Sequence, residues 1–189
     1  MKRGDIMPLV NGVHILECIP KKEKLGEGAT LYNFLAIFLE KERLKIENIK
    51  NKEDFFEKLN NNNFKIVHIS CHGYEDDEDG KFYIGGFPDE QVICSDEFYE
   101  SDHLKGRGVI ITGCKLGRAG FAKEFLEKTK ASSLIAPMKN IESFDVAAWC
   151  TIFYHHLFTE GGSFRDSYNY MKENFPFRGS MKGWRRENK

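Results

Sequence analysis

The chain has 189 residues, of which 41% are hydrophobic and 30% charged, a balance typical of one soluble globular domain. Its formal net charge of -1 argues against nucleic acid or an anionic membrane as the main partner. No apolar run approaches the length of a membrane span, and no continuous signal-peptide core follows Lys2 and Arg3. We expect a single domain over residues 1–175, followed by a basic, solvated or partner-docking tail over residues 176–189.

The cysteines favour a reducing compartment. There are five, with wide spacings and no CxxC pair, so neither a disulfide framework nor a zinc finger fits: Cys18, Cys71, Cys94, Cys114 and Cys150. We therefore expect a cytoplasmic protein. The sequence also lacks the glycine-rich fingerprints of nucleotide binding, so we expect no cofactor.

The first third of the chain predicts alternating strands and helices. The expected elements are a strand at 12–19, a helix at 31–44, a strand at 45–49, a helix at 52–59 and a strand at 64–70. Thr30 and Asn51 are the expected N-caps of the two helices. The strand at 64–70 is rich in β-branched residues without clear alternation, as expected for a strand covered on both faces.

The remainder of the chain continues this alternation. The expected elements are a strand at 80–86, a short helix at 95–104, a strand at 108–112, a helix at 119–128, a strand at 132–136, a helix from 143 or 145 to 158 and a helix at 164–173. Ser163 is the expected cap of the last helix. This order predicts an α/β domain around a mainly parallel sheet flanked by helices.

Two predicted strands end in residues suited to nucleophilic catalysis. The strand at 64–70 leads into Cys71, His72 and Gly73, and the strand at 108–112 leads into Gly113 and Cys114. Functional groups of open α/β sheets gather beyond the carboxyl ends of the strands, so neighbouring strands would bring His72 and Cys114 into one cleft. A histidine can accept the proton of a thiol, and the N–H groups of Gly73 and Cys114 could form an oxyanion hole.

Other roles for these residues remain open. Cys71 is a rival nucleophile, but neighbours along a strand point to opposite faces, so we expect it to be buried under a helix. His68 is expected to be a hydrogen-bonded core histidine. A zinc site made from His68, Cys71, His72 and Cys114 lacks the usual ligand spacing.

The segments VHISCHG and VIITGCKLG resemble the two active-site blocks of the caspase-like cysteine peptidases, and most closely those of the separase-related, largely bacterial CHAT-type branch. The resemblance extends over residues 50–175. It implies a caspase-like α/β sandwich and peptide-bond hydrolysis, with His72 as general base and acid, Cys114 as nucleophile and Gly73 as an oxyanion donor. The chain departs from the family at Ser70-Cys71, where Ser-Gly or Gly is common, and at Gly113, where Ala is common.

The acidic run 75–79 after His72 allows three interpretations. Its residues, among them Glu75, Asp76 and Asp77, could form a negative wall that selects a basic substrate residue, a weak calcium loop or a solvated loop tip. Asp145 could act as a helix cap or lie near the substrate pocket.

The resulting expectation is a cysteine endopeptidase acting on a protein or peptide substrate, with a regulatory protein partner. An effector role in bacterial defence or cell death is suggested by analogy. The alternatives are a catalytically silent caspase-like scaffold and another thiol enzyme, such as an acyl transferase.

Overall fold

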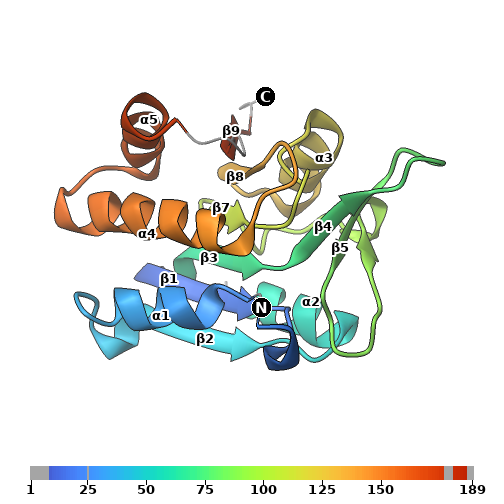
Figure 1. Ribbon diagram of the computed structural model, residues 1–189, viewed down its shortest axis with the longest axis horizontal. Helices are drawn as coiled ribbons and strands as arrows, with labels where there is room; N and C mark the ends of the chain where they lie inside the picture. The colour runs from blue at the N-terminus through green and yellow to red at the C-terminus, as the bar shows by residue number, and fades with distance from the viewer. Residues whose placement is uncertain (1–8, 25, 177–180, 187–189) are drawn as a thin grey trace, which may run out of the picture.

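A six-stranded sheet forms the centre of the molecule. The computed structural model describes residues 9–24, 26–176 and 181–186 (Figure 1). The strand order is β2-β1-β3-β7-β8-β9. All neighbouring strands pair in parallel except β9, which is antiparallel to β8. The strand bounds are β1 Val10–Glu17, β2 Leu44–Asn48, β3 Phe64–Ser70, β7 Gly108–Ile111, β8 Ser133–Pro137 and β9 Met181–Arg185.

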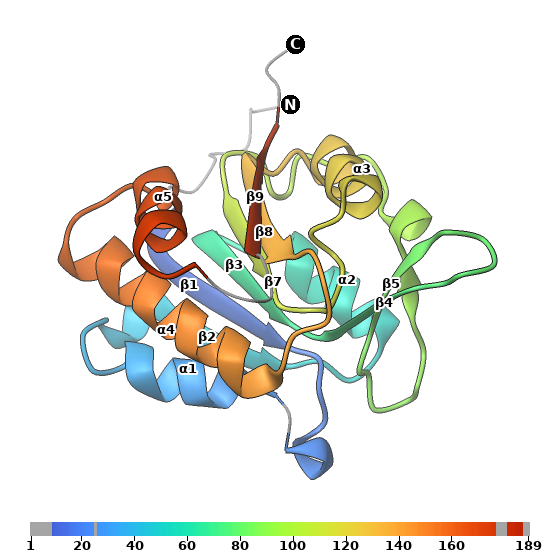
Figure 2. The ribbon, with the colours of Figure 1, turned by 45° about the horizontal axis from the view of Figure 1, so that its top comes forward.

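Helices cover both faces of this sheet (Figure 2). One face carries α1 (Gly28–Leu35), α4 (Ser143–Thr159) and α5 (Phe164–Asn174), and the other carries α2 (Lys52–Asn60) and α3 (Ala119–Thr129). Alternate strand residues point to alternate faces, so each face has its own hydrophobic core. The expected α/β class with a mainly parallel sheet is therefore confirmed. No helix in the described ranges is both long and apolar enough to cross a bilayer.

A small antiparallel sheet follows directly after β3. It consists of β4 (His72–Glu75), β5 (Phe82–Gly85) and β6 (Ile93–Cys94), and the β4–β5 hairpin projects beyond the main sheet (Figure 1). The sequence predicts β5, within 80–86, but neither β4 nor β6. Both are held by pairing with β5 rather than by a β pattern of their own.

The helix caps predicted at Asn51 and Ser163 are confirmed. The Asn51 side chain accepts a hydrogen bond from the Asp54 N–H at 2.8 Å, and the Ser163 hydroxyl accepts one from the Asp166 N–H at 3.1 Å. The prediction for the first helix is wrong, because Thr30 lies inside α1 and the helix ends at Leu35 rather than 44. A short 3-10 helix at Lys41–Arg43 then turns the chain so that Leu44 can be buried in β2.

The predicted helix over 95–104 is also wrong. Only Ser95–Glu97 forms a helical turn, of the 3-10 type. The following residues lie as an irregular strap that buries Phe98 and Leu104, and the Ser101 N–H bonds the Lys128 carbonyl at the end of α3. Tertiary burial of these two apolar residues overrides the local helical preference.

The basic tail does not leave the domain. Residues 181–185 form β9, whose Met181 is buried and whose Trp184 Nε1–H donates to the Gly117 carbonyl at 2.7 Å. The expectation of a solvated tail is wrong for this part, because the open edge of β8 offers unpaired backbone groups that β9 satisfies. Residues 177–180 and 187–189 lie outside the described residues.

Candidate active site

The two strands that precede the predicted dyad are neighbours. β3 pairs with β7 in parallel, and Ile69 lies opposite Ile111. The chain continues from these partners to His72 and to Cys114, three residues further along each strand. Both residues therefore emerge at the carboxyl edge of the sheet, as expected from the sequence.

The backbone at Gly73 lies directly against the peptide that carries Cys114. A Cβ atom at position 73 would lie 2.4 Å from the Cys114 carbonyl oxygen and 2.8 Å from the Cys114 nitrogen. Only glycine permits this approach, which brings the backbone of the His-Gly pair to that of the Gly-Cys pair. Within the described chain, the Cys114 N–H has no hydrogen-bond acceptor.

His72 is half exposed and is held by a residue that the sequence did not point to. Its Nε2 lies 2.9 Å from Glu23 Oε2, and its Cδ2 lies close to Gly86. A neutral ring that donates Nε2–H to Glu23 presents Nδ1 as its unprotonated, basic nitrogen. Glu23 lies in the charged segment KKEKLGEG after β1, where nothing in the spacing singles out one carboxylate.

Cys114 is half buried and is held by the loop between β8 and α4. The Ile141 N–H approaches its sulfur at 3.4 Å, and the Ile141 carbonyl oxygen lies 3.7 Å from the same atom. The Lys115 N–H also bonds the Lys139 carbonyl at 3.3 Å. Both contacts to Ile141 hold the Cys114 sulfur against the loop between β8 and α4.

The dyad is not closed in this conformation. Among the described residues, His72 bonds to Glu23 and Cys114 bonds to Ile141, with no hydrogen bond between His72 and Cys114. Catalytic hydrogen bonds are often long or misaligned before substrate binds. A side-chain movement that brings His72 to the Cys114 sulfur is therefore needed before proton transfer.

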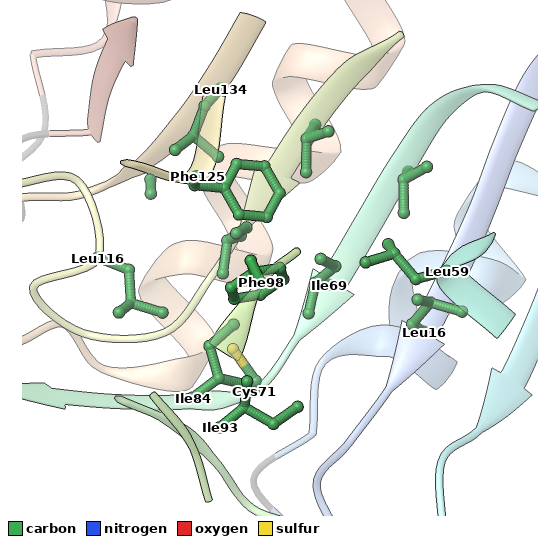
Figure 3. Packing of buried hydrophobic residues seen from close by; sticks show 14 of the residues in the cluster. Leu16, Leu59, Ile69, Cys71, Ile84, Ile93, Phe98, Leu116, Phe125 and Leu134 are labelled. Carbon is green, nitrogen blue, oxygen red and sulfur yellow. The ribbon is translucent and has the colours of Figure 1, made fainter. Parts of the chain in front are cut away.

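The rival nucleophile is buried on the other side of the sheet. Cys71 is 4% exposed and belongs to the core under α2 and α3, where Figure 3 shows it near Ile84 and Ile93. Burial raises the pKa of its thiol well above the ordinary value, so it stays protonated and unreactive. The expectation that Cys71 is structural is confirmed.

A buried polar cluster lies beneath the candidate dyad on the α1–α4 face. Its members are Glu17 at the end of β1, Glu27 before α1, His68 and Ser70 on β3, Thr112 after β7 and Tyr154 on α4. His68 bonds Tyr154 at 3.1 Å and Glu27 at 3.3 Å, which confirms it as a hydrogen-bonded core histidine. Sequence reasoning did not identify Glu17 or Glu27, because a buried carboxylate has no local pattern.

The pKa values of the two buried carboxyls move in opposite directions. Burial and the neighbouring Glu27 raise the pKa of Glu17 to about 7. Burial also acts to raise the pKa of Glu27, but hydrogen bonds from His68 and Thr112 outweigh it and hold that pKa below 4.5. At neutral pH the charge of the pair therefore resides mainly on Glu27.

The acidic residues expected to bind substrate differ in their surroundings. Glu75 forms ion pairs with Arg118 and Lys115, both of which follow Cys114. Asp76 accepts the Glu78 N–H at 2.7 Å in the β4–β5 turn, next to the exposed Asp77. Asp145 lies in the first turn of α4, four residues after Ile141, and forms no ion pair within the described chain. Among the described residues, Asp76, Asp77 and Asp145 thus carry no neutralising ion pair, whereas Glu75 carries two.

Two surface cavities lie away from the dyad. Their volumes are about 340 and 360 Å³, and both are lined by Ser132, Ser133 and Phe164, near the amino-terminal ends of β7 and β8. Neither is lined by His72 or Cys114. Among the described residues, no three His, Cys, Asp or Glu side chains are arranged to hold a metal ion.

Comparison with known proteins adds no assignment to this geometry. No model of a known protein family matches the chain, and no curated protein matches it. What the site does must therefore be inferred from its own residues and contacts.

Proposed function

We propose that this protein is a cysteine peptidase of the caspase-like type, with Cys114 as nucleophile and His72 as general base and acid. The observation that carries the proposal is the direct contact between the Gly73 backbone and the Gly113–Cys114 peptide. The resemblance of VHISCHG and VIITGCKLG to caspase-like and CHAT-type active-site blocks supports it independently. The mainly parallel sheet flanked by helices is compatible with this fold.

The chemistry follows from the roles of these groups. His72 Nδ1 takes the proton of the Cys114 thiol, and the thiolate sulfur attacks the carbonyl carbon of a peptide bond. The N–H of Cys114, and that of Gly73 where it is free, bind the oxygen as it becomes negative. The imidazolium of His72 then protonates the leaving amine, which leaves an acyl-enzyme. His72 next removes a proton from water, which attacks the thioester and releases the acid and Cys114.

Glu23 would keep the ring of His72 in the productive tautomer. Its carboxylate accepts Nε2–H and stabilises the imidazolium formed during the reaction. The substrate would be a protein or peptide segment crossing the carboxyl edge of the sheet, where Asp145 is the candidate to bind a basic residue. A cytoplasmic effector role in bacterial defence remains part of this proposal on the basis of analogy alone.

A second candidate is a catalytically silent binding module. The observation in its favour is that His72 and Cys114 each bond elsewhere, to Glu23 and to Ile141. A module of this kind would bind a protein partner at the same edge without cleaving it.

A peptide-library digest read by mass spectrometry tests the peptidase. We expect cleavage by the wild type that is lost, by about 100-fold or more, in Cys114→Ala and in His72→Ala. Glu23→Ala should retain a reduced rate. His155→Ala, which changes an exposed histidine on α4, is the matched control and should cleave normally.

Each other outcome has a clear meaning. Cleavage that survives Cys114→Ala would refute the assigned nucleophile. Absence of cleavage by the wild type, with and without cell lysate as a source of activator, would favour the binding module.

A further inference from the structure

Three oxygen atoms form a short chain beneath the candidate dyad. Ser70 Oγ is fully buried and lies 2.8 Å from Glu17 Oε1 and 2.9 Å from Glu27 Oε2. Both separations lie within the ordinary range for hydrogen bonds between oxygen atoms. The two carboxyl groups are thus linked through a single hydroxyl.

Counting hydrogens shows that this chain needs an additional proton. Two hydrogen bonds among three oxygens require two hydrogens, and the hydroxyl of Ser70 supplies only one. Ionised carboxylates supply none. The backbone donors nearby, the N–H groups of Ile19 at 3.1 Å and Gly28 at 2.8 Å, bond to Glu17 and not to Ser70. One carboxyl group must therefore be protonated, and the raised pKa of Glu17 marks it as the carrier.

The groups that face this pair offer little compensation for a second negative charge. His68 on β3 and Cys150 and Tyr154 on α4 can titrate on the same face, and Cys18 just after β1 and Cys71 just after β3 can titrate on the opposite face of the sheet. Burial raises the pKa values of the three thiols and the phenol well above their ordinary values, so these groups stay neutral. No lysine or arginine of the described chain pairs with either carboxyl, which leaves His68 alone beside Glu27.

The same carboxyls hold both ends of the segment that carries Glu23. Glu17 accepts the N–H groups of Ile19 and Gly28, which bracket that segment. Close contact accompanies these bonds, since a Cβ atom at Gly28 would lie 2.5 Å from the Glu17 carboxyl. Glu27 reaches from the same segment to Ser70 and Thr112. The position of Glu23 on His72 therefore depends on this pair.

We propose that Glu17 and Glu27, which share one proton through Ser70, are positioning residues that hold the described residues 18–24 and 26–28 (termed segment 18–28) and so keep Glu23 on His72. The link between these two carboxyls and catalysis rests on the proposed function, whereas the shared proton does not. Loss of that proton places two negative charges on neighbouring buried carboxyls, and their repulsion loosens the segment. Activity should then fall in mildly alkaline solution.

Glu27→Gln provides the sharpest test. Its amide can donate to Ser70 while its oxygen still accepts from Thr112 and His68, so the chain of bonds closes without a shared proton. For the wild type we expect kcat/KM to fall above about pH 7, approaching tenfold for each pH unit. In Glu27→Gln, kcat/KM should not show this fall at alkaline pH. Glu53→Gln, which changes an exposed glutamate on α2, should retain it.

Two measurements apply even if no peptidase activity exists. Infrared difference spectra near pH 6 should contain a protonated-carboxyl band in the wild type that Glu17→Gln removes. Amide exchange in segment 18–28, corrected for intrinsic rates, should quicken above pH 7 in the wild type and not in Glu27→Gln. Glu17→Gln replaces Glu27→Gln in the exchange and pH-rate measurements if the latter does not fold.

These results separate the two proposals. A missing carboxyl band, or exchange in segment 18–28 that does not respond to pH, would overturn the shared proton and its positioning role. A fall in kcat/KM above about pH 7 that persists in Glu27→Gln would also overturn it. A wild type without peptidase activity that still shows the band and the pH-dependent exchange would refute only the proposed reaction.

Discussion

Any side chain at position 73 would collide with the peptide that carries Cys114. The nearest atoms, at 2.4 to 2.8 Å, are all backbone, so no flexible side chain can move aside to make room. Relieving this collision would require β4 to move away from the loop that carries Cys114 (the cysteine loop). At the scale of single residues, Gly73 thus sets the spacing of the whole site.

Gly73→Ala should separate the two halves of the site. We expect a loss of about 1–3 kcal/mol in the free energy of unfolding, from overpacking, together with at least a ~100-fold loss of peptidase activity. Urea denaturation and the peptide digest measure the two effects. Gly85→Ala is the control on β5, since its Cβ would meet only side chains, at 3.5 Å or more. Equal changes in stability and activity in Gly73→Ala and Gly85→Ala would contradict the contact between Gly73 and the Cys114 peptide.

At the scale of elements, β9 supports the cysteine loop from the edge of the sheet. Trp184 on β9 bonds the Gly117 carbonyl, and the Gly117 N–H bonds the Pro137 carbonyl on β8 at 2.7 Å. Gly117 comes three residues after Cys114, so the turn that carries Cys114 is held from two strands. Part of the basic tail therefore has a structural role.

Trp184→Phe tests this support. It keeps an aromatic ring but removes the donor, which should cost about 1 kcal/mol of stability and quicken amide exchange at residues 114–118. Tyr168→Phe is the matched control, because its hydroxyl bonds the Met181 carbonyl at the other end of β9. Tyr168→Phe should lose a similar amount of stability without changing amide exchange at residues 114–118. Similar exchange at this loop in both variants would argue against a specific role for Trp184.

At the scale of the whole molecule, two buried groups give the stability opposite dependences on pH. Burial and Glu27 raise the pKa of Glu17 from 4.5 to about 7, so its contribution is present at low pH and is lost between these values. Burial and Lys45 lower the pKa of His14 from 6.5 to about 4, so its contribution is lost as the pH falls from 6.5. Between about pH 4.5 and 6.5 the two effects offset one another.

Glu17→Gln should remove one side of this balance. Its free energy of unfolding should rise with pH between about 4 and 6.5, by at most about 3 kcal/mol, because only the His14 effect remains. His14→Gln should show the reverse, with stability falling between about pH 4.5 and 7. Urea denaturation at a series of pH values measures both. Parallel curves for the wild type and both variants would show that neither group titrates as described.

Local sequence patterns predicted much of the scaffold. The strands β3 and β7, the helix α3 and the caps at Asn51 and Ser163 depend on neighbours in the chain, and all are confirmed. The end of α1, the strap after Ser95 and the pairing of β4 were not predicted. In each case burial or strand pairing with distant residues outweighs local preference.

The sequence by itself determined the α/β class, the strands that end in His72-Gly73 and Gly113-Cys114, and the burial of Cys71, since these follow from periodicity and from side-chain alternation. Only the tertiary structure decided that β3 and β7 are neighbours, that Glu23 binds His72, and that Glu17 and Glu27 meet through Ser70. Those contacts join residues up to 53 positions apart. They exist because packing two helical layers against one sheet brings the strand ends together, and no local pattern encodes which side chains then meet.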